Sequence, residues 1–159
     1  MKSVYVETSI ISYLAARPSK DLVSAARQMV TLDWWERRRK DFELYASPLV
    51  LAEISAGDEE AAKRRLEFFQ SLSSLDLTPE IEQLSRSIVH ECGMPDRASD
   101  DALHLATAAV NEVDYLLTWN CKHLANAELI AVFETFFPVK GYPTPIICTP
   151  DELMERYDV

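Results

Sequence analysis

Glycine and long apolar segments are what this sequence has least of. Only three glycines occur among 159 residues, and neither a repeat nor a low-complexity stretch interrupts the chain. No segment approaches the roughly 20 apolar residues that a membrane-spanning helix needs. The first residues also lack the basic segment followed by an apolar one that marks a secretory signal. We therefore expect a cytoplasmic protein with no membrane partner.

Cysteine is scarce as well, and its spacing excludes the usual cysteine frameworks. Cys92, Cys121 and Cys148 are odd in number, lie far apart and include no C-x-x-C pair. This pattern argues against a disulfide scaffold and against a structural zinc site. It predicts reduced thiols, which again favours the cytoplasm.

An excess of positive charge is absent too. The formal charge is −10 and the pI is near 4.7, so the protein as a whole does not attract the phosphates of nucleic acids. A role with nucleic acid would need a local basic patch, bound cations or a basic partner. The hydrophobic share of 48% and the charged share of 26% are those of an ordinary globular protein. The length predicts one domain over residues 1–159.

Strand and helix patterns alternate along the chain about five times. Short apolar runs predict strands at 4–6, 42–46, 74–77, 113–118 and 146–148. Helical spacing predicts helices at 10–14, 20–40, 49–54, 58–69, 80–92, 102–110 and 127–137, and a short one after 149. This alternation predicts an α/β fold in which helices sandwich a mainly parallel central sheet of about five strands.

Capping residues mark several of these helix starts. Ser47-Pro48 and Thr78-Pro79 each combine an N-cap with proline at the first helical position. Ser19 is the expected cap of the helix at 20–40. Ser99 or a neighbouring aspartate can cap the helix at 102–110.

Glu7 is the first candidate for a functional side chain. It follows the strand at 4–6 directly and precedes a helix. It therefore lies at the carboxyl end of a strand, where ligands bind in open α/β sheets, and it is a candidate metal ligand. The alternative is that Glu7, Thr8 or Ser9 merely caps the helix, because such residues commonly satisfy the free amides of a first turn.

Three more acidic residues are candidates for a functional role, because helix capping or solvent exposure does not fully explain their positions. Glu53 is the one carboxylate in a short helix that is apolar nearly all round, and burying it without a cation or a donor is costly. Asp100 and Asp101 open the helix at 102–110. Two adjacent acids exceed what capping needs, although surplus acids also occur in ordinary first turns.

Asn120 and Thr118 occupy a further strand end. Both follow the strand at 113–118 closely, so their oxygens are expected at the same edge of the sheet as Glu7. Oxygen ligands gathered in this way suit Mg²⁺ or Mn²⁺, which keep several waters and bind a substrate phosphate.

Histidine and arginine residues offer weaker signals. His104 faces into an apolar helix and is expected to be a hydrogen-bonded core residue. Cys121 and His123 form a weak metal pattern, because no further metal-binding residues elsewhere in the sequence complete a ligand set with them.

The basic run comprises Arg37, Arg38, Arg39 and Lys40. It is either a solvated last helical turn, which suits the helix dipole, or a phosphate-contacting patch beside aromatic residues.

Four segments stand out when taken in order: VYVETSIISYL at 4–14, SPLVLAEI at 47–54, DALHLATA at 101–108 and DYLLTWN at 114–120. Together they resemble the motifs of PIN-domain ribonucleases, most closely the VapC-type toxins of prokaryotic toxin–antitoxin modules. The resemblance extends to residues 147–153. It implies a PIN-like three-layer α/β/α sandwich and a Mg²⁺- or Mn²⁺-dependent endoribonuclease. A metal-activated water would hydrolyse RNA and leave a 5′-phosphate and a 3′-hydroxyl.

The resemblance also implies roles for individual residues. Glu7, Glu53, Asp101 and Asn120 match the catalytic positions, and the three acids are the implied metal ligands. Asp100 is a further candidate ligand. Glu7 replaces the usual aspartate and Asn120 replaces a common fourth acid, which predicts weaker cation binding than in the usual site.

Supporting residues and partners follow from the same resemblance. Ser9 and Thr118 match hydroxyls that orient the carboxylates. The implied partners are an RNA substrate, a cognate antitoxin protein and a second copy of the chain in a homodimer. The antitoxin is expected to cover the cleft with basic side chains, and the basic run at 37–40 is expected to contact RNA.

Two other functions stay open on the sequence. One is a catalytically weak or inactive PIN-fold module that binds RNA or protein, which the unusual Glu7 and Asn120 favour. The other is a different phosphate-handling α/β enzyme, such as a phosphatase with an acid nucleophile. That chemistry generally uses a second aspartate two residues after the first, and the chain has Ser9 at this position.

Overall fold

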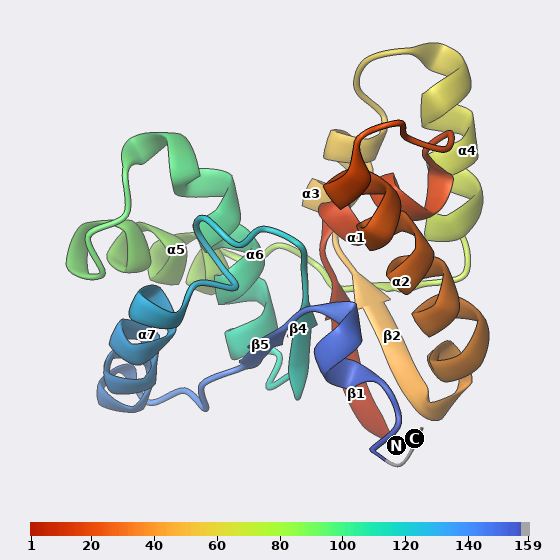
Figure 1. The fold of residues 1–159 in the computed structure, drawn as a ribbon. Coiled ribbons are helices and arrows are strands. Elements are labelled where there is room, and N and C mark those ends of the chain that lie inside the picture. Colours follow the sequence, from red (N-terminus) through yellow and green to blue (C-terminus); the bar gives the residue numbers. More distant parts are fainter. Residues whose placement is uncertain (157–159) are drawn as a thin grey trace.

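Five parallel strands form the centre of the fold (Figure 1). The computed structural model describes residues 1–156, and its strands are β1 (Lys2–Val6), β2 (Phe42–Ala46), β3 (Ser73–Ser74), β4 (Tyr115–Leu117) and β5 (Ile146–Cys148). Their order across the sheet is β3-β2-β1-β4-β5, and all four pairings are parallel. The predicted α/β class is confirmed.

Helices cover both faces of the sheet (Figure 1). One layer holds α1 (Thr8–Ala15), α2 (Leu22–Arg38), α3 (Pro48–Ile54) and α4 (Glu59–Phe69). The other holds α5 (Pro79–Glu91), α6 (Ser99–Val110) and α7 (Ala127–Lys140). Short 3-10 helices are η1 (Arg39–Asp41), η2 (Asp96–Ala98) and η3 (Pro150–Leu153). The three layers are those of the expected α/β/α sandwich.

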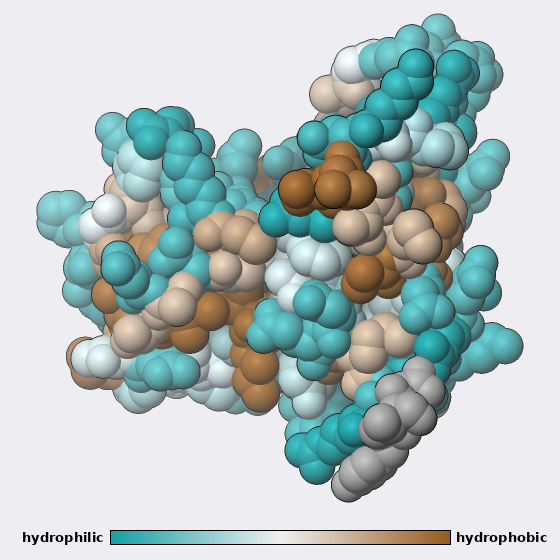
Figure 2. All heavy atoms as spheres, in the orientation of Figure 1, coloured by the Kyte–Doolittle hydropathy of each residue, from teal (hydrophilic) through white to brown (hydrophobic). Residues whose placement is uncertain are grey.

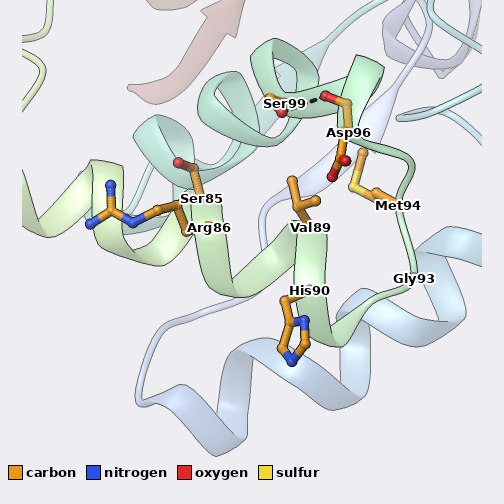
Figure 3. A pocket seen from close by; sticks show the side chains of 8 residues that line it. All are labelled: Ser85, Arg86, Val89, His90, Gly93, Met94, Asp96 and Ser99. Carbon is orange, nitrogen blue, oxygen red and sulfur yellow. Dashed lines mark hydrogen bonds between the residues drawn. The ribbon is translucent and has the colours of Figure 1, made fainter.

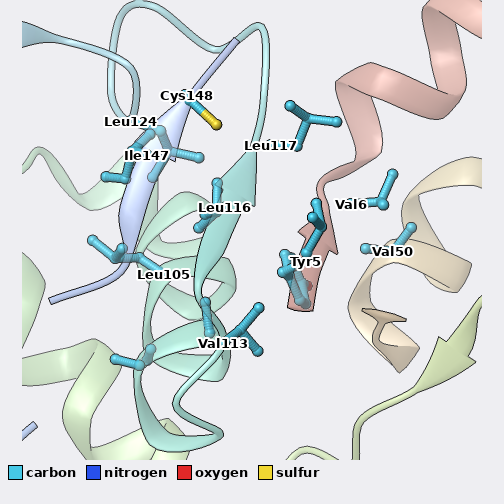
Figure 4. Close-up of a cluster of buried hydrophobic side chains, with 14 of the residues drawn as sticks. Tyr5, Val6, Val50, Leu105, Val113, Leu116, Leu117, Leu124, Ile147 and Cys148 are labelled. Carbon is cyan, nitrogen blue, oxygen red and sulfur yellow. The ribbon is translucent and has the colours of Figure 1, made fainter. Parts of the chain in front are cut away.

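The central strands are apolar because helices bury them from both sides. Val4, Tyr5 and Val6 of β1 have no exposed surface, and neither have Leu116 and Leu117 of β4. A parallel strand between two helical layers lacks a solvent face, so consecutive residues of these strands contribute to the core. Figure 4 shows this cluster with further members from the surrounding elements, including Val50, Leu105, Leu124 and Ile147.

Several predicted boundaries were wrong because a different local contact decides them. α2 begins at Leu22, because Asp21 rather than Ser19 accepts an amide hydrogen of the first turn. The strand predicted at 74–77 is only β3, Ser73–Ser74. It stops there because β2 ends at Ala46, whose carbonyl takes the last bond from the Leu75 amide.

The helices of the second half also begin and end differently. No side chain caps α6, because η2 leads directly into it and Ala98 occupies the N-cap position; the predicted cap at Ser99 or an aspartate was wrong. α7 continues through Pro138 to Lys140, and Gly141 ends it with a φ of +87° that favours glycine. The final helix is the 3-10 helix η3.

The remaining sequence expectations concern caps, membranes and thiols. Ser47 and Thr78 cap α3 and α5 as predicted. None of the helices formed by residues 1–156 has the length and apolar character that crossing a membrane requires. The three cysteines are free, and burial, with smaller contributions from neighbouring acids, raises the pKa of the Cys148 thiol to about 12.

Replacing Leu116 with alanine should destabilise the fold strongly. Its side chain is fully buried in β4, so truncation leaves a cavity that typically costs about 2–5 kcal/mol. Leu22→Ala is the matched control, because Leu22 is 84% exposed and should change the free energy of unfolding little. Urea denaturation of both variants measures this difference, and equal losses would contradict the described core.

Candidate functional site

The sheet changes its winding direction between β1 and β4. From β1 the chain proceeds outward through β2 to β3, and then crosses to β4 on the other side of β1. Open α/β sheets bind ligands at the carboxyl ends of the strands on either side of such a switch point. Glu7 follows β1 and Thr118 follows β4. The Glu7 amide donates to the Leu117 carbonyl across the junction at 3.1 Å.

Glu7 is held at this junction by both of its carboxylate oxygens. The Thr118 hydroxyl donates to Oε1 at 2.8 Å, and the Ser9 amide donates to Oε2 at 2.5 Å. Glu7 is thus the N-cap of α1, as one interpretation of the sequence predicted, and its role as a metal ligand stays a prediction. The Ser9 hydroxyl accepts a hydrogen bond from the Trp119 amide at 2.8 Å and so ties α1 to the segment that follows β4.

Burial makes the charge of Glu7 costly. The residue is only 4% exposed, and burial raises the pKa of its carboxyl, although the positive influence of His104 and the hydrogen bonds from Ser9 and Thr118 oppose this. The net result is a raised pKa. A cation nearby would favour the ionised form of this carboxylate.

Glu53 reaches the same region from α3. The Thr8 hydroxyl donates to its Oε1 at 2.8 Å, and His104 Nε2 lies 2.5 Å from the same oxygen. Burial raises the pKa of the Glu53 carboxyl, but the hydrogen bond and charge of His104, with the bond from Thr8, outweigh burial and leave the pKa lowered. The other oxygen, Oε2, has no partner among residues 1–156.

His104 is the hydrogen-bonded core residue that was predicted. It is 1% exposed, its Nδ1 lies 2.7 Å from the Tyr5 hydroxyl, and that hydroxyl lies 2.7 Å from Ser47 Oγ. Sequence reasoning missed that its other nitrogen binds a candidate catalytic carboxylate. The sequence spacing could have indicated this role. His104 follows Asp101 by three residues, and residues i and i+3 share a helix face, so His104 lies on the same face as a candidate catalytic residue.

Asp101 belongs to a second hydrogen-bonded group. Its Oδ2 lies 3.0 Å from His123 Nδ1, and its Oδ1 has no partner among the described residues. The Asn120 side-chain oxygen accepts the His123 amide at 3.0 Å, so this oxygen is engaged within its own turn. Asp100 is exposed at the start of α6.

The candidate residues therefore form two groups rather than one closed set of ligands. Glu7 and Glu53 belong to the first, Asp101 and Asn120 to the second. Within residues 1–156, no three His, Cys, Asp or Glu side chains are arranged to hold a metal ion. The donor chemistry nevertheless fits a hard divalent cation, because Glu53 and Asp101 each keep one carboxylate oxygen without a protein partner.

The basic run at 37–40 is not brought to the carboxylates. It ends α2 and forms η1, immediately before β2 begins, and so lies at the amino edge of the sheet. The length of β2, about 15 Å, separates this edge from the carboxyl edge. Arg37 pairs with Asp33 and Glu155, and Arg38 with Asp41. Arg39 lies over the Trp35 ring.

The space-filling view shows a hollow in the surface between the group of helices that contains α1 and α3 and the group that contains α5 and α6 (Figure 2). An apolar patch borders this hollow (Figure 2). A separate pocket of about 560 Å³ lies between α5 and the start of α6 (Figure 3). Its Arg86 and His90 point in different directions, and none of the candidate residues lines it, so we do not assign the site there.

The fold and the site define an α/β domain with acidic side chains on both sides of a topological switch point. The chain belongs to the PIN domain family, whose sequence pattern matches residues 4–120. No curated protein matches the sequence.

Solved structures with the same fold include components of toxin–antitoxin complexes. VapBC2 from Rickettsia felis, bound to promoter DNA, has 18% identity and a TM-score of 0.59, with 92% of this chain and 97% of that chain covered. VapC20 from Mycobacterium tuberculosis, a toxin that cleaves the sarcin–ricin loop, has 16% identity and a TM-score of 0.60, with 76% and 92% covered. A Klebsiella pneumoniae toxin–antitoxin complex has 18% identity and a TM-score of 0.58, with 93% and 98% covered. At these identities the likeness concerns the fold.

Glu7→Gln should stabilise the metal-free protein at neutral pH. The uncharged amide avoids the cost of a buried charge, and it can donate to Thr118 and accept from the Ser9 amide. Because the folded-state pKa of Glu7 is raised, the wild type carries this cost in full above that pKa and loses it as the pH falls to the ordinary pKa of the group. The advantage of the variant should shrink as pH falls towards 4.5, and thermal unfolding in EDTA measures it. A variant less stable than the wild type at pH 7 would contradict the argument.

Proposed function

We propose that the protein is a Mg²⁺- or Mn²⁺-dependent endoribonuclease that acts as the toxin of a toxin–antitoxin module. The observation that supports this most is the position of Glu7, Glu53 and Asp101 around the switch point of a PIN domain. These three come from widely separated parts of the sequence: Glu7 follows β1, Glu53 belongs to α3 and Asp101 to the first turn of α6.

Each proposed ligand is held by the chain's own donors. Glu53 Oε2 and Asp101 Oδ1 would contact the cation, with Glu7 beside them at the switch point. When bound, the cation would lower the pKa of a water molecule and neutralise charge on the phosphate under attack. Thr118 and the Ser9 amide orient Glu7.

Asn120 has a different proposed role from a carboxylate. Its side-chain oxygen already accepts the His123 amide, whereas its Nδ2 has no partner among residues 1–156. A free amide nitrogen is a donor. We therefore infer that Asn120 contacts a phosphate oxygen of the substrate rather than the cation.

The substrate and partners are proposed from the relatives and the resemblance. VapC20 cleaves the sarcin–ricin loop, and the Klebsiella pneumoniae structure is a toxin–antitoxin complex. For this chain we propose an RNA substrate, an antitoxin with basic side chains that covers the acidic cleft, a homodimeric state and action in the cytoplasm.

Purified protein should cleave RNA in the presence of Mn²⁺, and Glu53→Gln or Asp101→Asn should reduce cleavage to background. Each variant removes one negative charge from the proposed cation site while preserving side-chain size. Glu36→Gln, at an exposed position of α2, is the control and should cleave normally. A time course on gel-resolved RNA measures this, and equal cleavage by the wild type, Glu53→Gln and Asp101→Asn would exclude this site.

The contact between RNA and Arg37, Arg38, Arg39 and Lys40 stays a prediction. Lys40→Ala should weaken RNA binding by a similar factor for all RNA sequences. It should also reduce the slope of log affinity against log salt concentration by about 1, as expected when one phosphate contact is lost. Lys63→Ala removes an exposed lysine outside the run and should leave binding unchanged. Fluorescence anisotropy at several salt concentrations compares them, and identical curves for the two variants would remove the assignment.

A non-catalytic PIN-fold binding module is the second candidate. Two observations favour it: no three metal-binding side chains converge in residues 1–156, and both oxygens of Glu7 already have protein donors. Calorimetry with Mn²⁺ separates the two functions. Absence of binding at millimolar metal, together with retained RNA affinity, would favour this module over the nuclease.

A further inference from the structure

Two of the proposed cation ligands share an unusual feature: each carboxylate is anchored by a histidine at one oxygen only. His104 contacts Glu53 Oε1, and His123 contacts Asp101 Oδ2. In both carboxylates the second oxygen has no partner among residues 1–156. The two histidines come from different elements, one within α6 and one in the segment between β4 and α7.

His104 is fixed by contacts at both ring nitrogens. An ionised carboxylate only accepts hydrogen bonds, so Nε2 carries the hydrogen that points to Glu53. Nδ1 is held by the Tyr5 hydroxyl, which is itself held by Ser47. Because the ring is buried and bonded at both nitrogens, it has little freedom to rotate. It therefore links Tyr5 of β1 to Glu53 of α3 and restricts the rotation of the Glu53 carboxylate.

His123 holds Asp101 in a more open setting. Its side chain is 16% exposed and that of Asp101 is 21% exposed. The carboxylate is bonded by Nδ1 rather than Nε2. The backbone amide of His123 is bonded to Asn120, so the turn after β4 fixes the position from which the ring reaches α6.

We propose that His104 and His123 are positioning residues, each of which turns one carboxylate so that its free oxygen, Glu53 Oε2 or Asp101 Oδ1, faces the divalent cation. This inference rests on the cation site of the proposed function. Neither histidine contacts the ion. Their contribution is to limit the rotation of the two carboxylates, and such outer partners typically change metal affinity by about 10–100-fold.

The two histidines offer an internal test because opposite nitrogens make the two contacts. The amide nitrogen of glutamine lies two bonds beyond Cγ, as Nε2 of histidine does, whereas that of asparagine lies one bond beyond, as Nδ1 does. His104→Gln should therefore keep the contact to Glu53, and His104→Asn should lose it. At position 123 the order reverses, so that His123→Asn keeps the contact to Asp101 and His123→Gln loses it.

Mn²⁺ affinity of the four full-length variants, measured by calorimetry and by the electron paramagnetic resonance signal of free Mn²⁺, tests the proposal. We expect near-wild-type affinity for His104→Gln and His123→Asn. Affinity should be about 10–100-fold weaker for His104→Asn and His123→Gln. General damage to the fold would not produce rescue by glutamine at one position and by asparagine at the other.

Each outcome bears on one of the two claims. If the wild type binds Mn²⁺ and asparagine and glutamine behave alike at each position, the positioning role is overturned while the proposed nuclease stands. If the wild type binds no Mn²⁺, the cation site fails and this inference fails with it. Thermal unfolding monitors folding. Should the buried His104 variants not fold, the partly exposed His123 pair decides the question alone.

Discussion

A carboxylate buried where the sheet changes direction is the constraint on which the rest of the site depends. Glu7 lies between the ends of β1 and β4 and is almost fully buried, so its charge must be balanced within the protein or by a ligand. Thr118 and the Ser9 amide supply part of that balance. They do not restore the carboxyl to its ordinary pKa, and a cation at the switch point would offset the cost that remains.

The surrounding hydrogen bonds join the layers of the sandwich at this same place. Tyr5 belongs to β1, His104 to α6 on one face and Glu53 to α3 on the other. The chain of contacts through these three residues therefore crosses the sheet edge. His104 is buried in the core and needs such polar connections, since a buried polar atom requires a partner. Packing and function thus constrain the same residues.

Much of the architecture could be predicted from local patterns, whereas the pairing of site residues could not. The apolar run at 4–6 and the Ser47-Pro48 start each specify an element through local sterics and capping, and both formed as expected. The contact between His104 and Glu53 spans 51 positions and depends on how α3 and α6 face each other, which no local pattern encodes. The position of the basic run at 37–40 relative to the carboxylates also depends on the order of the elements, because the run ends α2 and precedes β2 and so lies at the amino edge of the sheet.

The central claim is that oxygens from distant parts of the chain converge on one divalent ion. A crystal structure of the protein grown with Mn²⁺, with anomalous diffraction recorded to locate manganese, tests it most directly. We predict one anomalous peak between Glu53 Oε2 and Asp101 Oδ1, on the side where Glu7 lies. A structure without a peak there, in which these carboxylates keep only their protein partners, would contradict the claim.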